Sequence, residues 1–108
     1  MSPVYDRSRL VELFGDDPAT LAEIEREFLD TARSAEREIR GTDDLQVIAR
    51  AAHRVKGSSG MIGADALSAV AAAVEKAAKA HDLSAVRQLD ETLRHEVAKV
   101  ASLISDRG

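Results

Sequence analysis

Apolar residues recur at three- and four-residue steps along most of this chain, and this periodicity constrains the fold more than any other feature. Such spacing is typical of amphipathic α-helices, whose side chains repeat about every 3.6 residues. No strand-length window alternates apolar and polar residues with period two. The hydrophobic residues, 44% of the sequence, are mostly Ala, Leu, Val and Ile, and Ala and Leu are strong helix formers. We therefore predict an all-α protein.

Capping and turn residues divide the periodic pattern into one short and four long segments. The predicted helices are 6–14, Pro18 to about Arg40, Thr42 or Asp43 to Gly63, Asp65 to near His81-Asp82, and a last helix after Ser84. The residues predicted to face the core are Leu21, Ile24, Phe28, Ala32, Ala35, Ile39, Leu45, Ile48, Ala52, Val55, Ser59, Ile62, Leu67, Val70, Ala71, Val74, Ala78, Val86, Leu89, Leu93, Val97, Val100 and Ile104. Long helices with short connections predict an antiparallel up-down-up-down four-helix bundle with a short additional N-terminal helix. We expect residues 1–108 to form this single domain.

Composition and charge exclude several classes of protein. The chain has no cysteine, which excludes disulfides, Cys-ligated metals and a cysteine nucleophile. Its formal net charge of −4 disfavours nucleic acid as a partner, because phosphate contacts need concentrated positive charge. The longest apolar run, 69–74, is far too short to span a membrane, and residues 1–7 contain no visible secretory signal. We expect a cytoplasmic protein.

Gly57-Ser58-Ser59-Gly60 interrupts the helix-forming pattern in the middle of the third predicted helix. Each interior glycine costs about 1 kcal/mol relative to alanine, so something other than helix propensity accounts for the pair. One interpretation is a break in the helix, and the other is a surface that a second molecule approaches closely. The apolar stripe continues in phase through Ser59 to Ile62, which favours the second interpretation.

His53 lies on the flank of the same helix, about 120° from the centre of the apolar stripe. Gly57 follows it by four residues and shares its face, while Arg50, Arg54 and Lys56 place positive charge around it. Neutral imidazole offers a nucleophilic lone pair on Nε2, and nearby cations favour that form and attract phosphate. The arrangement suits a nucleophile that handles an anion, with Lys56 neutralising phosphoryl oxygens and Gly57 leaving room for a partner.

The segment from His53 to Ala64, HRVKGSSGMIGA, closely resembles the signature of histidine-containing phosphotransfer (HPt) domains. That signature is a histidine, two residues, Lys-Gly, small residues, and Gly-Ala or similar shortly after. Other positions that resemble the family are Ala51-Ala52, Leu67, Glu75 and the Asp82-Leu83 turn. The resemblance covers nearly the whole chain. Arg54 departs from the pattern, since many members have a small residue there, and its added charge bears on partner choice.

The resemblance implies a phosphorelay protein without kinase activity of its own. His53 would accept a phosphoryl group from the aspartate of a response-regulator receiver domain and pass it to another receiver domain, in a pathway that includes a hybrid histidine kinase. Lys56 would stabilise the phosphate charge, and Gly57 would give the partner access. The residues implied to contact the partner are Arg50, Arg54, Gly60 and Met61. A monomer without cofactor or metal is expected, because Mg²⁺ is held by the receiver's acidic pocket.

Two alternatives use the same helix face. One is a helical adaptor that binds receiver domains without turnover, and the other is the phosphoacceptor module of a chemotaxis-type histidine kinase. The intact His-x-x-Lys-Gly string disfavours the adaptor, because binding alone does not need a nucleophile. The initiating Met1 favours a free-standing protein over a module of a kinase.

The remaining polar residues of interest have structural interpretations. We expect Ser59 to pack inward with its hydroxyl bonded back to its own helix, and Gly60 either to relieve helix crowding or to serve the partner. His81 falls at a helix C-terminus, where the helix dipole favours a cation. His95 lies opposite the apolar stripe of the last helix and is expected on the surface.

Overall fold

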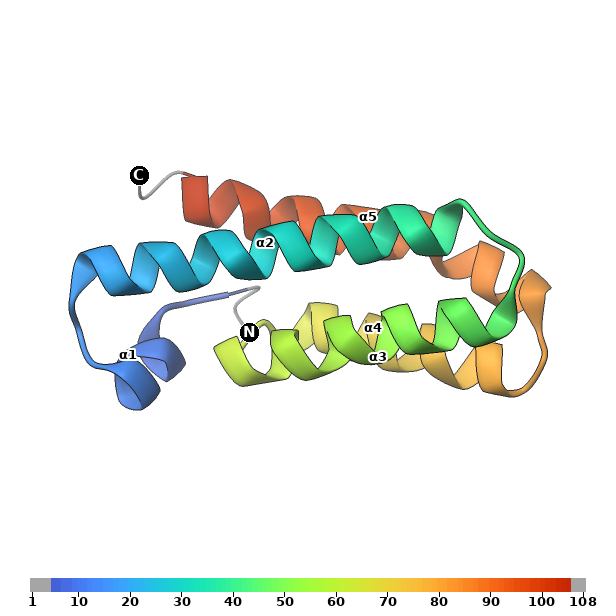
Figure 1. The fold of residues 1–108 in the computed structure, drawn as a ribbon, viewed down its shortest axis with the longest axis horizontal. Coiled ribbons are helices and arrows are strands. Elements are labelled where there is room, and N and C mark those ends of the chain that lie inside the picture. Colours follow the sequence, from blue (N-terminus) through green and yellow to red (C-terminus); the bar gives the residue numbers. More distant parts are fainter. Residues whose placement is uncertain (1–4, 106–108) are drawn as a thin grey trace.

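The computed structural model describes residues 5–105, which form five helices and the turns between them. The helices are α1 (Ser8–Phe14), α2 (Pro18–Arg40), α3 (Leu45–Ile62), α4 (Asp65–Lys79) and α5 (Leu83–Ser105). The four long helices run alternately up and down, with α2 and α5 in one layer and α3 and α4 in the other (Figure 1). This confirms the predicted all-α bundle with a short N-terminal helix. Residues 1–4 and 106–108, which include Met1 and part of the segment without a secretory signal, lie outside the described range.

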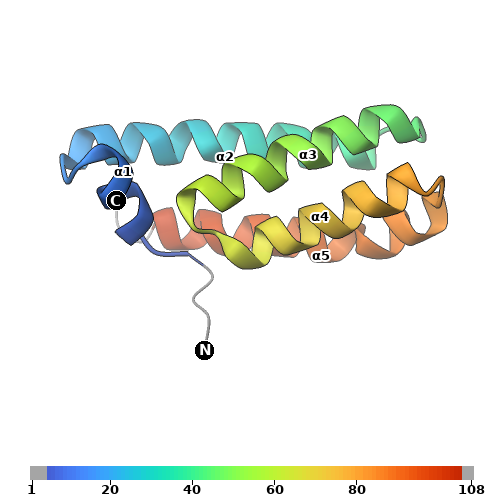
Figure 2. The ribbon, with the colours of Figure 1, turned by 90° about the horizontal axis from the view of Figure 1, so that it is seen from below.

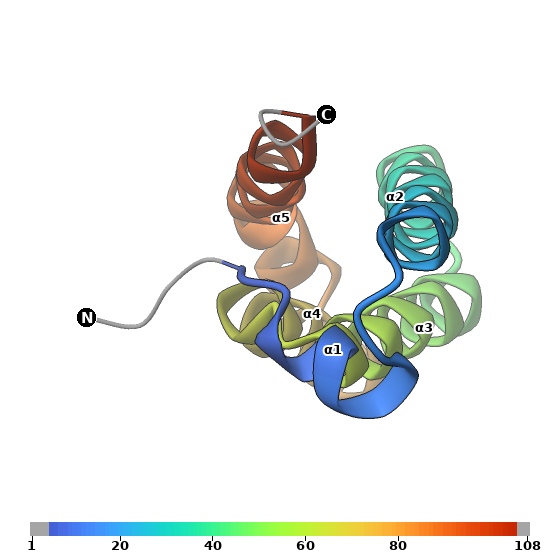
Figure 3. The same cartoon turned by 90° about the vertical axis from the view of Figure 1, so that its left-hand side faces the viewer.

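The core of the bundle consists of the apolar stripes that the periodicity predicts. Every position predicted to face inward is buried, except five that are partly buried against the core: Ile24, Leu45, Val70, Leu89 and Ile104. Each long helix packs against two neighbours, and the interface between α3 and α4 is the most extensive (Figure 3). No helix within residues 5–105 is both long and apolar enough to cross a membrane. The close contact of α3 with α4 is what brings side chains of both helices to one site.

Two of the predicted helix boundaries rest on side-chain and backbone geometry that the structure confirms. The Asp17 side chain caps α2 by accepting a hydrogen bond from the backbone N–H of Thr20, at 3.1 Å. Gly63 ends α3 with a φ of 84°, a left-handed conformation that favours glycine. The sharp turn at Gly63 allows α4 to start two residues later and return along α3 (Figure 2).

The predicted start of α3 at Thr42 or Asp43 is wrong by a few residues. Asp44 is the N-cap, because its carboxylate accepts hydrogen bonds from the backbone N–H groups of Gln46 and Val47. A side-chain oxygen at this position satisfies donors that the first helical turn leaves free. The sequence alone does not identify the N-cap, because Thr42, Asp43 and Asp44 are all residue types that cap helices well.

The turn between α4 and α5 also differs from the prediction. α4 ends at Lys79 rather than at His81-Asp82, because His81 has a left-handed φ of 60° that stops the helix. α5 begins before Ser84, since the carboxylate of Asp82 accepts a hydrogen bond from the N–H of Ala85 at 3.0 Å. Asp82 therefore caps α5, and the helix begins at Leu83 rather than after Ser84.

The N-terminal segment is fixed to the bundle by a buried carboxylate. Glu25 of α2 accepts hydrogen bonds from the Tyr5 hydroxyl at 2.5 Å and from Arg7 at 2.7 and 3.0 Å. Arg9 of α1 donates to the backbone carbonyl of Gly60 at 2.8 Å. Helix α1 therefore lies across the end of the bundle where α3 ends and α4 begins (Figure 3).

Candidate functional site

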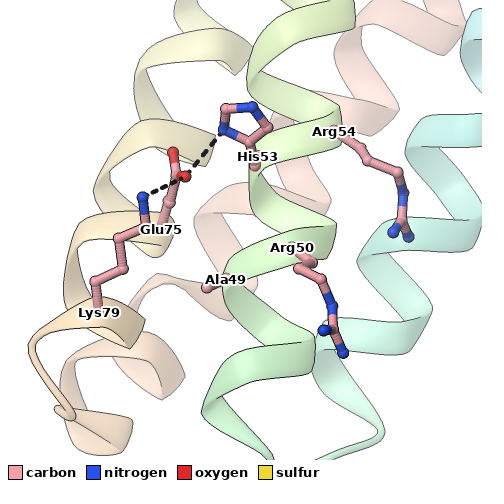
Figure 4. Close-up of a pocket in the computed structure, with 6 residues that line it drawn as sticks. All are labelled: Ala49, Arg50, His53, Arg54, Glu75 and Lys79. Atoms are coloured by element: carbon pink, nitrogen blue, oxygen red, sulfur yellow. Dashed lines mark hydrogen bonds and ion pairs between the residues drawn. The ribbon is translucent and has the colours of Figure 1, made fainter.

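His53 projects from the surface of α3 on the side that faces α4. Its side chain is 65% exposed, and its Nδ1 atom lies 3.0 Å from Oε2 of Glu75 on α4 (Figure 4). An open depression of about 550 Å³ adjoins the ring. The residues that line it are Ala49, Arg50, His53, Arg54, Glu75 and Lys79. The imidazole is therefore accessible from solvent while one of its nitrogens is held by the protein.

Glu75 is almost completely buried and binds three side chains at once. Its Oε1 atom lies 3.0 Å from Nζ of Lys56, and its Oε2 atom lies 3.0 Å from both His53 Nδ1 and Lys79 Nζ. The hydrogen bond from Lys56, followed by those from Lys79 and His53, lowers the pKa of Glu75 from 4.5 to about 2, although burial acts in the opposite direction. The carboxylate is thus ionised throughout the physiological pH range.

The ionised Glu75 defines which nitrogen of His53 is free. A carboxylate only accepts hydrogen bonds, so the Nδ1 atom that faces it is the one that donates. In the neutral ring the other nitrogen, Nε2, then keeps its lone pair. Because most of the side chain is exposed, the geometry leaves a nucleophilic nitrogen available to another molecule.

The charges around His53 are arranged differently from the expected ring of cations. The charge that contacts the imidazole is the Glu75 carboxylate, and Lys56 is paired with that carboxylate instead of standing free. Arg50 and Arg54 extend from α3 toward α2, away from Glu75, and Arg54 lies 3.2 Å from Glu38 (Figure 4). The predicted cations therefore lie near His53 along α3, but the charged group that bonds to the ring is the Glu75 carboxylate.

The two glycines of α3 have different surroundings. A Cβ atom added at Gly57 would meet nothing within 4 Å, so this position next to His53 is open to solvent. A Cβ atom added at Gly60 would lie 3.6 Å from Oγ of Ser68, which places that face of Gly60 against α4. Met61 follows with a side chain that is 46% exposed. The open surface beside the imidazole therefore centres on Gly57, with Met61 further along the helix.

The helix continues through the Gly-Ser-Ser-Gly segment without a break, as the phase of the stripe predicts. Ser59 is buried as expected, but its hydroxyl has no hydrogen-bond partner among the described residues, so the predicted bond back to the helix is wrong. Ser59 points into the apolar core, whereas the half-buried Ser58 donates to the carbonyl of Arg54 at 2.8 Å. The serine that bonds back to α3 is thus Ser58.

From the sequence we predict no contact for two members of this site. Glu75 is named there only as a position that resembles the family, and Lys79 is not named. Glu75 follows Ala71 by four residues and precedes Ala78 by three, so it falls on the apolar stripe of α4. A charged residue on a buried stripe needs partners from a neighbouring helix. The position of Glu75 on this stripe therefore indicates a buried, paired carboxylate. The position of Lys79, four residues after Glu75, follows from the same helix spacing.

The other two histidines lie away from this site. Both are exposed, His81 in the turn after α4 and His95 on the outer face of α5. Among residues 5–105 no group of three or more histidine or carboxylate side chains is placed to hold a metal ion. His53 is therefore the histidine with an organised environment in the described part of the chain.

Fold and site together define a four-helix bundle that presents an exposed imidazole, oriented by a buried carboxylate, on the flank of its third helix. Residues 10–103 match the family model of the Hpt domain. The chain belongs to this family, whose members carry out histidine phosphotransfer in phosphorelays and interact with receiver domains. Searches among curated proteins and among solved structures give no match.

Proposed function

We propose that this protein accepts a phosphoryl group on His53 from the aspartate of a receiver domain and passes it to the aspartate of another receiver domain. The observation that carries the proposal is the hydrogen bond between Nδ1 of His53 and the buried carboxylate of Glu75, on an imidazole that is 65% exposed. In the neutral ring this bond places the proton on Nδ1 and leaves the lone pair on Nε2. An adaptor that only binds has no need of such an arrangement.

The transfer step requires no proton to move. The Nε2 lone pair attacks the phosphorus of the aspartyl phosphate, the new N–P bond forms, and the P–O bond to the aspartate breaks so that its carboxylate leaves with the electron pair. The ring keeps its proton on Nδ1 and becomes positively charged. Glu75 faces that proton and stabilises the charge, as the carboxylate of a Ser-His-Asp triad stabilises its imidazolium. Transfer onward to a second aspartate reverses these bond changes.

Lys56 and the partner supply the remaining charge stabilisation. Lys56 is 40% exposed and pairs with Glu75, the carboxylate that also binds His53. Its flexible side chain reaches the phosphoryl oxygens by rotating outward. Phosphoryl transfer depends mainly on positioning and on neutralising these oxygens. The Mg²⁺ that supports the reaction is assigned to the acidic pocket of the receiver domain, where it neutralises phosphoryl charge.

The docking surface lies around Gly57, where a partner approaches the helix backbone without meeting a side chain. Met61 lies beside a depression of about 180 Å³ between α2 and α3 that includes Ile24, Phe28 and Ser58. Arg50 and Arg54 flank His53 on the opposite side of this surface and offer positive charge to an acidic partner. Gly60 is the weakest member of the proposed contact set, because part of its surface faces Ser68.

The wider setting is proposed on the family resemblance. We expect a single domain that acts as a monomer in the cytoplasm, in a pathway with response-regulator receiver domains and a hybrid histidine kinase. No kinase activity is expected from this chain.

The test is to incubate the protein with a receiver domain that carries ³²P on its aspartate. The wild type is expected to take up acid-labile, alkali-stable label, and His53→Gln is expected to take up none. His95→Gln is the matched control, because it removes an exposed imidazole from α5 without touching the site. Label on His53→Gln, with circular dichroism showing that the variant is folded, would overturn the assignment.

Two further measurements, of receiver binding and of labelling by a kinase, separate the alternatives. If the protein is an adaptor, the wild type and His53→Ala would bind the receiver equally well, and neither would take up label. A phosphoacceptor module of a chemotaxis-type kinase would take up label from a kinase domain and ATP when no phosphorylated receiver is present. Label that passes from one receiver to this protein and then to a second receiver supports the proposed relay.

A further inference from the structure

Lys79 shares a carboxylate oxygen with His53, although it lies outside the His-x-x-Lys-Gly segment. Both Lys79 Nζ and His53 Nδ1 are 3.0 Å from Oε2 of Glu75. Lys56 Nζ lies 3.0 Å from the other oxygen, Oε1. In the described part of the chain the hydrogen bonds and ion pairs of Glu75 thus come from His53 and Lys56 on α3 and from Lys79 on α4, with none from α5.

The two lysines differ in what they can do during transfer. Lys56 lies on α3 one turn from His53, and it is the cation suited to follow the phosphoryl group. Turning outward to the phosphoryl oxygens moves its ammonium away from Glu75 and weakens their ion pair. Lys79 lies four residues after Glu75 on the same helix (Figure 4), and its Nζ contacts Oε2, whereas Lys56 contacts Oε1. Its side chain is 67% exposed, so it approaches Glu75 from solvent.

A second cation matters because Glu75 is buried. Its side chain is only 7% exposed, and a buried carboxylate that loses its partner either pays a desolvation cost or takes up a proton. A protonated Glu75 would no longer stabilise the charge that develops on the ring of His53. If Lys56 were the only cation, the movement that helps the phosphoryl group would weaken the carboxylate that helps the imidazole.

We propose that Lys79 is a positioning residue that keeps Glu75 ionised and hydrogen-bonded to His53 Nδ1 while Lys56 turns to the phosphoryl group. This inference rests on the proposed phosphorylation of His53. Lys79 acts through Glu75 and does not contact the phosphoryl group itself. The two lysines therefore divide the work, one serving the phosphoryl group and the other serving the carboxylate.

The test uses three variants of the full chain. Lys79→Gln removes the charge, Lys79→Arg retains it, and Lys76→Gln removes an exposed lysine from the same helix that forms no ion pair among the described residues. Each protein is studied free and after phosphorylation by phosphoramidate, a small donor that needs no receiver domain. The protonation of Glu75 is followed by ¹³C NMR of its carboxyl carbon, and the rate of phosphorylation is measured against pH.

We expect the Glu75 carboxylate of the wild type to stay ionised after phosphorylation down to about pH 4, where an exposed glutamate is already more than half protonated. In Lys79→Gln the titration of Glu75 moves upward by about one pH unit or more, and the shift is larger in the phosphorylated protein. The phosphorylation rate of this variant then falls at the acid end of the pH profile. Lys79→Arg restores both properties, and Lys76→Gln resembles the wild type.

Two outcomes would overturn the inference, and they are distinguishable. If His53 is phosphorylated but Glu75 titrates alike in Lys79→Gln, Lys76→Gln and the wild type, the role of Lys79 is wrong and the proposed function stands. If neither phosphoramidate nor a phosphorylated receiver places phosphate on His53, the proposed function and this inference both fail.

Discussion

In the proposed mechanism, the reactivity of His53 depends on a residue from another helix. Glu75 comes from α4, 22 positions further along the chain, and its carboxylate fixes the Nδ1 side of the ring. Lysines on both sides lower the pKa of Glu75 to about 2, so the carboxylate remains ionised when the ring becomes positively charged. The site is therefore a carboxylate-imidazole pair rather than an isolated histidine among cations.

Glu75→Gln tests this pair directly. Glutamine is similar in size, but it cannot stabilise positive charge on the ring as a carboxylate does, so phosphorylation of His53 is expected to slow by about ten- to hundredfold. The measurement is the rate of labelling by a phosphorylated receiver. Glu91→Gln on the exposed face of α5 is the control, since that carboxylate pairs with Arg94 and lies away from the site. An unchanged rate in Glu75→Gln would remove the carboxylate from the mechanism.

Ser59 offers a test of packing at the same scale. Its hydroxyl is buried without a partner among the described residues, and a buried polar group without a hydrogen bond costs about 1–3 kcal/mol. Ser59→Ala is therefore expected to leave the free energy of unfolding unchanged or to raise it by up to about 1 kcal/mol, as measured by urea denaturation. A loss of more than about 1 kcal/mol would mean that the hydroxyl makes a stabilising hydrogen bond.

At the scale of the helices, α3 is an unbroken helix that carries an open position at Gly57. The glycine is not required by backbone conformation, because the residue is helical and a Cβ atom there would meet nothing within 4 Å. Because Gly57 weakens the helix and packing does not require it, the close approach of a partner is the best explanation for this glycine. The cost in helix propensity, about 1 kcal/mol, is consistent with a surface kept free for a partner.

Gly57→Ala separates stability from access. We expect the free energy of unfolding to rise by about 1 kcal/mol, because alanine is the better helix former, while transfer from a phosphorylated receiver slows by about tenfold. Labelling by phosphoramidate, which is small, should be nearly unchanged. Gly60→Ala adds the same methyl group beside Ser68 of α4 and should slow transfer less. Equal transfer by Gly57→Ala and the wild type would contradict the role of this position.

The helices themselves were largely predictable from the sequence. The stripes from Leu21 to Ile39 on α2 and from Ile48 to Ile62 on α3 follow the helical period closely, and burial follows the stripes. The start of α3 was not predictable to the residue, because Thr42, Asp43 and Asp44 are all capping residues and only the folded backbone selects one.

The site was predictable in part, for a related reason. His53 and Gly57 belong to one helix, so their shared face follows from spacing alone. The contact of His53 and Lys56 with Glu75 depends on the register between α3 and α4. That register is set by packing in three dimensions, which helical periodicity does not encode. The burial of Ser59 follows from the apolar stripe, but whether its hydroxyl finds a hydrogen-bond partner depends on side-chain packing, and among the described residues it has none.

At the scale of the whole molecule, the net charge of −4 conceals a local concentration of positive charge. The cations around His53 are Arg50, Arg54, Lys56 and Lys79. The carboxylates paired with them are Glu38 and Glu75. A partner with an acidic pocket would be attracted to this part of the surface, although the protein as a whole is acidic.

The salt dependence of partner association measures this attraction. Raising the ionic strength from about 0.1 M to about 1 M shortens the Debye length from about 10 Å to about 3 Å. Association with a receiver domain, followed by stopped-flow fluorescence, is expected to slow by about tenfold or more. Arg50→Gln should reduce both the association rate and its dependence on salt, whereas Arg37→Gln on α2 retains the cations around the site. Association that does not respond to salt would show that these cations do not guide the partner.

The most direct measurement of the central claim is NMR of the phosphorylated protein with ¹⁵N-labelled histidine. The orientation of His53 toward Glu75 predicts a ¹⁵N–³¹P coupling at Nε2 of His53, a proton retained on Nδ1, and no phosphorus signal at His81 or His95. Phosphorus on Nδ1 of His53, or on either of the other histidines, would contradict it.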